Sequence, residues 1–288
     1  MIITIVLIIL FFCLIILLFT YTDYLAHYNT NLKFSELNKK LDYDNKKTCI
    51  LISGQIRDNY YNILLLQKLF LIDPLNADVF CVFNDDIDEK DKKKIENLLN
   101  PKYIIWLKNG KNDFNNNYTP NLNYMFQKIY LCNNLKKQYE SENNFIYDFA
   151  IRIRPDIYIK SKVPTKIFNN IDNNTFYSPC LFKLDYSTNV LKFGVTDQIW
   201  MSNSTVMNSA CDIFLKMLNK QESSENLCQS PEIFLKKYLL KNNIKIEYFY
   251  NFRFIIDKLN NEDESIISTI YYLSKKPLYI GNCFLNSD

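Results

Sequence analysis

The sequence is poor in several residue types on which familiar active sites depend. His27 is the one histidine among 288 residues, which argues against a Ser-His-Asp triad and a histidine-rich zinc site. Four widely spaced glycines exclude a Walker phosphate loop and a dinucleotide-binding fingerprint. The eight cysteines contain no C-x-x-C pair, so their spacing predicts neither a zinc cluster nor a redox centre. The candidate catalytic and binding residues are therefore carboxylates, arginines and lysines.

Charge and composition favour an ordinary globular chain. The 34 basic and 31 acidic side chains give a formal net charge of +3, which argues against a protein that mainly coats nucleic acid. Hydrophobic residues make up 48% of the chain, enough for one domain or two small ones at roughly 100–200 residues each.

The N-terminus carries one long apolar run. Residues 2–22 contain no charged side chain, and about 20 apolar residues span the hydrocarbon core of a bilayer. A cleaved signal peptide is the alternative, but no lysine or arginine precedes the run. We predict a transmembrane anchor over 1–22, a stem or disordered linker over 23–47, and one domain over 48–288.

The flanking residues leave both membrane orientations open. Lysines just after the apolar run favour keeping the domain on the cytosolic side. Three N-x-S/T triplets favour the other side, although an asparagine-rich chain produces such triplets by chance. These residues are Lys33, Lys39 and Lys40, and Asn117, Asn173 and Asn203. The predicted localisation is a single-pass membrane protein.

Short apolar runs alternate with longer amphipathic stretches from residue 48 onward. This rhythm predicts an α/β fold with an open, mainly parallel sheet flanked by helices. The expected strands are 48–53, 78–83, 103–107, 146–154, 175–179, 197–202 and 244–250. The expected helices are 60–72, 88–99, 122–141, 204–219 and 231–240, with an asparagine-rich loop at 109–121.

Arginine is rare, so its positions are informative. Four arginines stand against 30 lysines, and three of the four lie at or just after the end of an expected strand. The first follows the strand 48–53 in the segment S-G-Q-I-R-D. Gly54 allows a tight turn there, and the guanidinium of Arg57 could bind a pyrophosphate oxygen. A plain strand-to-helix turn with a surface arginine is the alternative.

The segment I-R-I-R-P-D at 151–156 ends another apolar strand. Side chains alternate along a strand, so Arg152 and Arg154 share one face, and the proline ends the strand with Asp156 at the rim of the sheet. Two guanidinium groups on one face need counter-charge. A ligand diphosphate could supply it, and so could carboxylates in a structural ion-pair network.

Together these segments resemble a family. S-G-Q-x-R at 53–57, A-D-V-F at 77–80, Y-D and R-x-R-P-D within 147–156, a D-Q strand at 197–202 and P-E at 231–232 resemble nucleotide-sugar glycosyltransferases of the GT-A type from bacteria and large DNA viruses. The resemblance spans about 48–250 and rests on the order of short motifs. It departs from that family's Asp-x-Asp triplet, because R-P-D stands at the matching place.

The resemblance implies roles for single residues. Gly54, Arg57, Arg152 and Arg154 would bind the nucleotide-sugar donor. Asp156 would hold Mn²⁺ or Mg²⁺, or the donor's ribose and diphosphate.

Three further carboxylates complete the implied site. Asp85, just past the second expected strand, would contact the base or ribose, with a solvated acidic loop as the alternative. Asp197 and Glu232 would be the catalytic carboxylates, because an inverting transfer needs a base for the acceptor hydroxyl. Glu232 also fits the first turn of a helix, where a carboxylate is stabilised without any catalytic role.

Three hypotheses follow. The first is a membrane-anchored glycosyltransferase that moves a sugar to a glycan, lipid or protein. The second is an inactive binding or scaffold protein of the same GT-A-like fold, with its arginines locked in internal pairs. The third, transfer of another activated group such as sulfate, is disfavoured by the absence of a glycine-rich phosphate loop.

Overall fold

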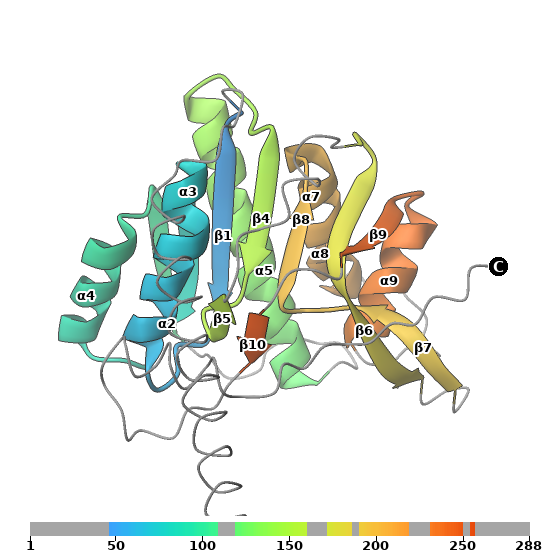
Figure 1. Cartoon of the computed structure of the whole chain (residues 1–288), viewed down its shortest axis with the longest axis horizontal. Coiled ribbons are helices and arrows are strands. Elements are labelled where there is room, and N and C mark those ends of the chain that lie inside the picture. The colour runs from blue at the N-terminus through green and yellow to red at the C-terminus, as the bar shows by residue number, and fades with distance from the viewer. Residues whose placement is uncertain are drawn as a thin grey trace, which may run out of the picture. The chain divides into compact units, whose positions relative to one another are not determined.

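A mixed eight-stranded sheet forms the centre of the structure (Figure 1). Its strand order is β3-β2-β1-β4-β8-β6-β7, and β9 pairs with β6. All the described residues belong to one compact unit. The computed structural model describes residues 46–108, 119–159, 172–185, 190–218, 231–249 and 254–256.

The parallel half of the sheet is built from four strands with apolar sequences. Strand β1 (Thr48–Gly54) lies between β2 (Asp78–Asn84) and β4 (Phe149–Ile153), and β3 (Tyr103–Leu107) lies beyond β2. Every residue of β4 is buried, as expected for a strand covered on both faces. The chain leaves β1 toward β2 on one side and later returns as β4 on the other, so β1 and β4 flank a topological switch point.

The other half of the sheet is largely antiparallel. Strand β8 (Ile199–Ser202) pairs antiparallel with β4, and β6 (Thr175–Asp185) pairs antiparallel with β8 and with β7 (Val190–Val195). Strand β9 (Lys245–Phe249) runs parallel to β6.

A two-stranded sheet stands apart from the large one. It pairs β5 (Ile157–Ile159) with β10 (Phe254–Ile256). Strand β5 follows β4 after only three residues, which fixes where the segment between them turns.

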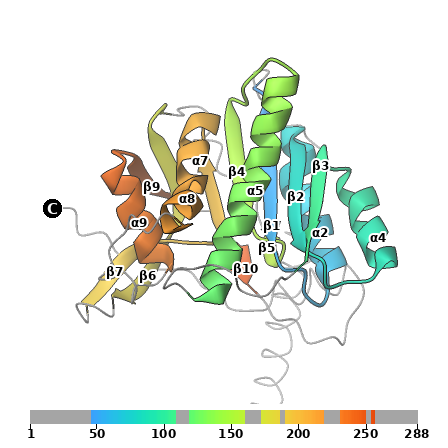
Figure 2. The same ribbon diagram turned by 180° about the vertical axis from the view of Figure 1, so that it is seen from behind.

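Helices cover both faces of the large sheet. The long helix α5 (Pro120–Glu142) crosses one face against β1 and β2, and the helices of the C-terminal half lie on that same face (Figure 2). These are α7 (Ser204–Cys211), α8 (Ile213–Leu218) and α9 (Pro231–Lys241). The opposite face carries α2 (Tyr60–Gln67), the π-helical turn η1 (Lys68–Ile72) and α3 (Asp73–Leu75), with α4 (Glu89–Leu99) beside α2.

The expected α/β fold class is confirmed, although some single elements differ from those expected. All seven expected strands are present, and the sheet is mainly parallel with helices on both faces. The single helix expected over 204–219 is wrong, because the described part divides at Asp212 into α7 and α8. Strands β5, β7 and β10 were not expected, since two of them have three residues and Lys192 interrupts the apolar pattern of the third.

The predicted anchor over 1–22 lies outside the described residues, as does nearly all of the linker over 23–47. Among the helices that the structure describes, none is long and apolar enough to cross a membrane. The anchor and the domain boundaries therefore stay predictions.

Candidate functional site

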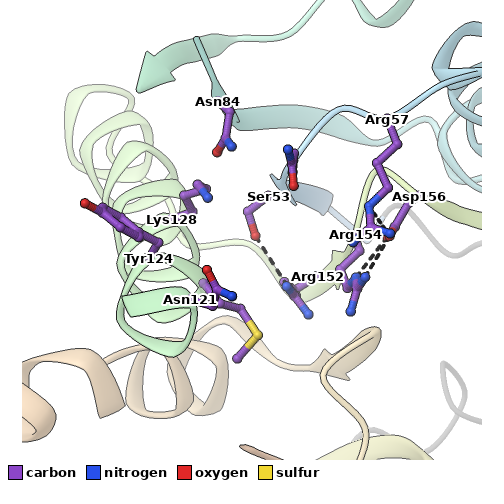
Figure 3. A pocket seen from close by; sticks show the side chains of 12 residues that line it. Ser53, Arg57, Asn84, Asn121, Tyr124, Lys128, Arg152, Arg154 and Asp156 are labelled. Carbon is purple, nitrogen blue, oxygen red and sulfur yellow. Dashed lines mark hydrogen bonds and ion pairs between the residues drawn. The ribbon is translucent and has the colours of Figure 1, made fainter. Parts of the chain in front are cut away.

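A cavity of about 500 Å³ opens at the carboxyl ends of β1, β2 and β4 (Figure 3). This is the switch point at which ligands bind in open α/β sheets. One wall is formed by the strand ends and the other by the first turns of α5. The lining residues are Ser53, Gly54, Gln55, Arg57, Asn84, Asn121, Tyr124, Met125, Lys128, Arg152, Arg154 and Asp156.

Both arginine-bearing motifs meet at this cavity. Gly54 lies against Pro155 so closely that a Cβ atom at position 54 would stand 2.8 Å from Cδ of the proline. Its φ of +153° is also one that other residues rarely adopt. Gln67 Nε2 donates hydrogen bonds of 2.9 Å to the carbonyl oxygens of Arg154 and Ile157. The R-P-D turn is therefore held by the packing of Gly54 on Pro155 and by the hydrogen bonds of Gln67.

Arg154 is tied to two carboxylates. Its Nε and Nη2 donate to the two oxygens of Asp156 at 2.9 and 2.7 Å, and its Nη1 donates to Asp197 Oδ2 at 2.8 Å. Arg57 adds a second guanidinium to Asp156, with 3.3 Å between Nε and Oδ2. Burial lowers the pKa of Arg154, but its bonds to Asp156 and the charge of Asp197 outweigh burial and leave that pKa above its ordinary value.

Arg152 is more deeply buried, and within the described ranges no carboxylate is bonded to it. It is 1% exposed, and its guanidinium lies 4.8 Å from the centre of the Trp200 ring. Nε donates to Ser53 Oγ at 3.4 Å, and Nη1 donates to the backbone carbonyl of Asp197. Burial lowers the pKa of Arg152 to about 10, against the opposing charge of Asp197.

Lys128 lines the cavity from α5, and the sequence analysis missed it. It is 6% exposed, and it makes no hydrogen bond or ion pair within the part of the chain that the structure describes. Its ammonium lies 6.0 Å from the Tyr124 ring centre. Burial lowers the pKa of Lys128, with a weaker opposing effect from Asp86. The sequence did contain a signal for this position, because the spacing of four lining residues matches one face of a helix. These residues are Asn121, Tyr124, Met125 and Lys128.

Asn84 lines the β2 side of the cavity, and Asp86 lies behind it, bonded to lining residues. Asp86 Oδ2 accepts hydrogen bonds of 3.3 Å from Gln55 Nε2 and from Asn84 Nδ2. The Oδ1 atom of Asn84 is buried and has no hydrogen-bond partner among the described residues. The cavity wall therefore offers a polar side chain whose bonding capacity is only partly used.

The structure brings together five of the eight predicted site residues: Gly54, Arg57, Arg152, Arg154 and Asp156 all line the cavity. The other three predicted residues are not part of the cavity lining. Asp197 is bonded to the lining residue Arg154, Asp85 forms an ion pair with Lys92 of α4, and Glu232 is buried in the first turn of α9.

Asp156 does not fit a divalent cation. Both of its oxygens accept from guanidinium groups, whereas Mg²⁺ and Mn²⁺ need carboxylate oxygens free to coordinate them. Across the described ranges, no three His, Cys, Asp or Glu side chains lie together in a group that could hold a metal ion.

The cavity instead carries a surplus of positive charge. Four of its lining residues are cationic and one is anionic. Counting Asp86 and Asp197, which bond to lining residues, leaves the cations in excess. Such a wall favours an anionic ligand.

Comparison with known proteins finds similar structures and no similar sequence. The sequence matches no protein-family model and no curated protein. The apo-form glycosyltransferase GlyE of Streptococcus pneumoniae TIGR4 matches with 14% identity and a TM-score of 0.43 over 70% of this chain, which spans 45% of GlyE. Core-mannan synthase A (CmsA/Ktr4) of Aspergillus fumigatus, in a Mn/GDP form, matches with 8% identity and a TM-score of 0.45 over 75% of this chain and 76% of that one.

A third match is the mannosyltransferase Ktr4p of S. cerevisiae in complex with GDP. It has 10% identity and a TM-score of 0.42 over 81% of this chain and 80% of its own. All three matched proteins transfer or polymerise sugars by their descriptions. With TM-scores below 0.5, these likenesses assign neither a family nor an activity to this chain.

Proposed function

We propose that this chain is a glycosyltransferase that binds a nucleotide-sugar donor in the cavity at the ends of β1, β2 and β4. The observation that carries the proposal is the pair of buried cations Lys128 and Arg152 at a topological switch point, neither bonded to a carboxylate among the described residues. Isolated buried cations cost free energy unless a partner balances them, and a diphosphate is such a partner. The motif order at 53–57 and 151–156 resembles enzymes whose ligand is a nucleotide sugar.

The acceptor in this proposal is a hydroxyl of a glycan, lipid or protein. An inverting transfer needs a carboxylate to take the proton of that hydroxyl. Neither predicted carboxylate lines the cavity, but Asp197 is the better placed of the two, because it bonds to the lining residue Arg154. We include a membrane anchor over 1–22 in the proposal, on the strength of the apolar run.

The alternative of an inactive scaffold protein has one observation in its favour. Arg154 is neutralised by Asp156 and Asp197, as a purely structural network requires. Arg152 has no such partner among the described residues, and the cavity beside Gly54 is open. The combination favours a ligand site over a closed network.

The test is a panel of UDP-, GDP- and dTDP-sugars with the full-length chain in detergent, with nucleoside diphosphate release as the readout. We expect at least one donor to be hydrolysed or transferred. Asp156→Asn should reduce that activity at least tenfold, because Arg57 loses its carboxylate partner and Arg154 keeps only Asp197. Asp148→Asn is the matched control, since this exposed carboxylate sits just before the other end of β4. Absence of turnover and binding for every donor would exclude the proposal.

A further inference from the structure

Two of the four cavity cations have no carboxylate bonded to them. Arg57 and Arg154 share Asp156, and Arg154 also reaches Asp197. Lys128 and Arg152 form no ion pair within the described ranges. Two of the three arginines predicted to bind the donor, Arg57 and Arg154, are therefore already neutralised. The available charge lies on the third, Arg152, and on Lys128, which the sequence did not predict.

That pair faces one space from two walls. Lys128 reaches in from α5 and Arg152 from the end of β4, with Ser53 between them (Figure 3). Both side chains are more than nine-tenths buried and both line the cavity. Burial weakens the hydration of each cation, so an anion between them would meet strong attraction in a region of low dielectric constant.

Arg152 is partly held by Ser53 and the Asp197 carbonyl, whereas Lys128 has no evident structural purpose in the described fold. Lys128 bonds to nothing in the described fold, and an apolar side chain of similar length would fill its place without the cost of burying a charge. The paired carboxylate Asp156 is surrounded by guanidinium groups, which repel a metal ion. The charge that a metal would supply to a diphosphate is thus already provided by side chains.

We infer that Lys128 and Arg152 bind the diphosphate of the donor directly and that no divalent cation takes part in holding it. This inference rests on the proposed function and names how its ligand is held. The Asp156 network then has a positioning role: it fixes the R-P-D turn that follows Arg152. Sugar nucleotides and nucleoside diphosphates share the recognised group, so either should bind.

The experiment measures binding by titration calorimetry on the full-length chain in detergent. The ligands are UDP, GDP, dTDP, the corresponding nucleosides and inorganic pyrophosphate, each in EDTA and again with Mn²⁺. We expect at least one diphosphate to bind in EDTA with an affinity that Mn²⁺ changes less than threefold. Lys128→Met should weaken that binding at least tenfold, and Lys128→Arg should retain most of it.

Two controls separate this role from a general effect. Lys137→Met removes a positive charge from the same helix at a partly exposed site paired with Asp212, and should leave binding unchanged. Thermal unfolding without ligand should show that Lys128→Met is at least as stable as the wild type. Weaker binding in a variant of unimpaired stability cannot then come from misfolding.

The outcomes distinguish the two proposals. Diphosphate binding that requires Mn²⁺, or that survives Lys128→Met unchanged, would overturn the inference and leave the proposed function standing. Pyrophosphate binding that depends on Lys128, without binding of any nucleotide, would keep the anion pair and reject the nucleotide-sugar donor.

Discussion

Helix α5 carries two buried lysines whose surroundings are opposite in character. Lys136, in the second half of the helix, is fully buried, with 3.1 Å between its Nζ and Glu140 Oε2 and a further bond to Ser204 Oγ. Glu140 Oε1 in turn accepts from Ser204 Oγ at 2.6 Å and from the Tyr147 amide at 2.9 Å. Lys128 lies about 12 Å away along the helix axis and has no such partners in the described fold.

This difference indicates that the charge of Lys136 stabilises the fold, whereas the charge of Lys128 is available to a ligand. Around Lys136, every bond joins elements of the fold, namely α5, the start of α7 and the residues before β4. Around Lys128, the bonding capacity points into open space. In α5, the buried Lys136 therefore stabilises the fold, whereas the burial of Lys128 lowers the free energy of unfolding.

The largest expected effect is at Lys136. Lys136→Met leaves the Glu140 carboxylate buried without its cation, which should lower the free energy of unfolding by about 3–5 kcal/mol. Urea denaturation followed by circular dichroism measures the change. The double variant Lys136→Met with Glu140→Gln should recover part of the loss. A loss below about 1 kcal/mol would contradict the structural role of this pair.

The next effect tests the close contact between Gly54 and Pro155, which joins the two motifs by packing and not by charge pairing. Gly54→Ala places a methyl group 2.8 Å from Cδ of Pro155, at a backbone φ of +153° that alanine rarely adopts. Overpacking of this kind costs about 1–3 kcal/mol. Donor binding should fall with it, since both motifs move. An unchanged unfolding midpoint in urea would show that the contact between the two motifs is loose.

The smallest effect has the opposite sign. Lys128→Met removes an unbalanced buried charge, so it should raise the free energy of unfolding by about 1 kcal/mol at neutral pH. The same denaturation measurement applies, with Lys137→Met as the control. A destabilised Lys128→Met would mean that the ammonium is bonded within the fold and would remove the contrast with Lys136.

The pH dependence sharpens this comparison. Burial holds the pKa of Lys128 below its ordinary value of 10.5, so the unfolded chain binds more protons than the folded chain between the lowered pKa and 10.5. The wild type should therefore gain stability as pH rises through that window. Its deficit relative to Lys128→Met should shrink over the same range. A deficit that stays constant up to pH 10.5 would show that the lysine has an ordinary pKa.

The fold was predictable because its strands are apolar runs with sharp ends. Sequences such as TCILIS and DVFCVF can only be buried strands, and the glycine and arginine motifs follow them directly. The alternation along β4 also placed Arg152 and Arg154 correctly on one face. The strand β7 escaped prediction, because Lys192 breaks the apolar pattern and its partner strand decides its conformation.

The bonding within the site was not predictable. Arg152 and Arg154 are both arginines that line the cavity. Asp197 nevertheless bonds its carboxylate to Arg154, 43 residues away, and its backbone carbonyl to Arg152, 45 residues away. Lys128 is one of three lysines in α5, with the buried Lys136 and the partly exposed Lys137, and the packing of α5 on β1 and β2 buries it. These bonding partners and this burial depend on contacts between segments far apart in the sequence, which no local sequence pattern predicts.

The position of Arg152 over Trp200 gives the protein a built-in optical reporter. The chain has two tryptophans, and Trp106 lies on β3, two strands away from β1. The emission of a buried indole responds to a positive charge beside its ring, so an anion that draws the guanidinium toward the cavity should alter the fluorescence of Trp200. Occupancy of the cavity could then be followed without any label, and substitution of Trp106 by phenylalanine would isolate the signal.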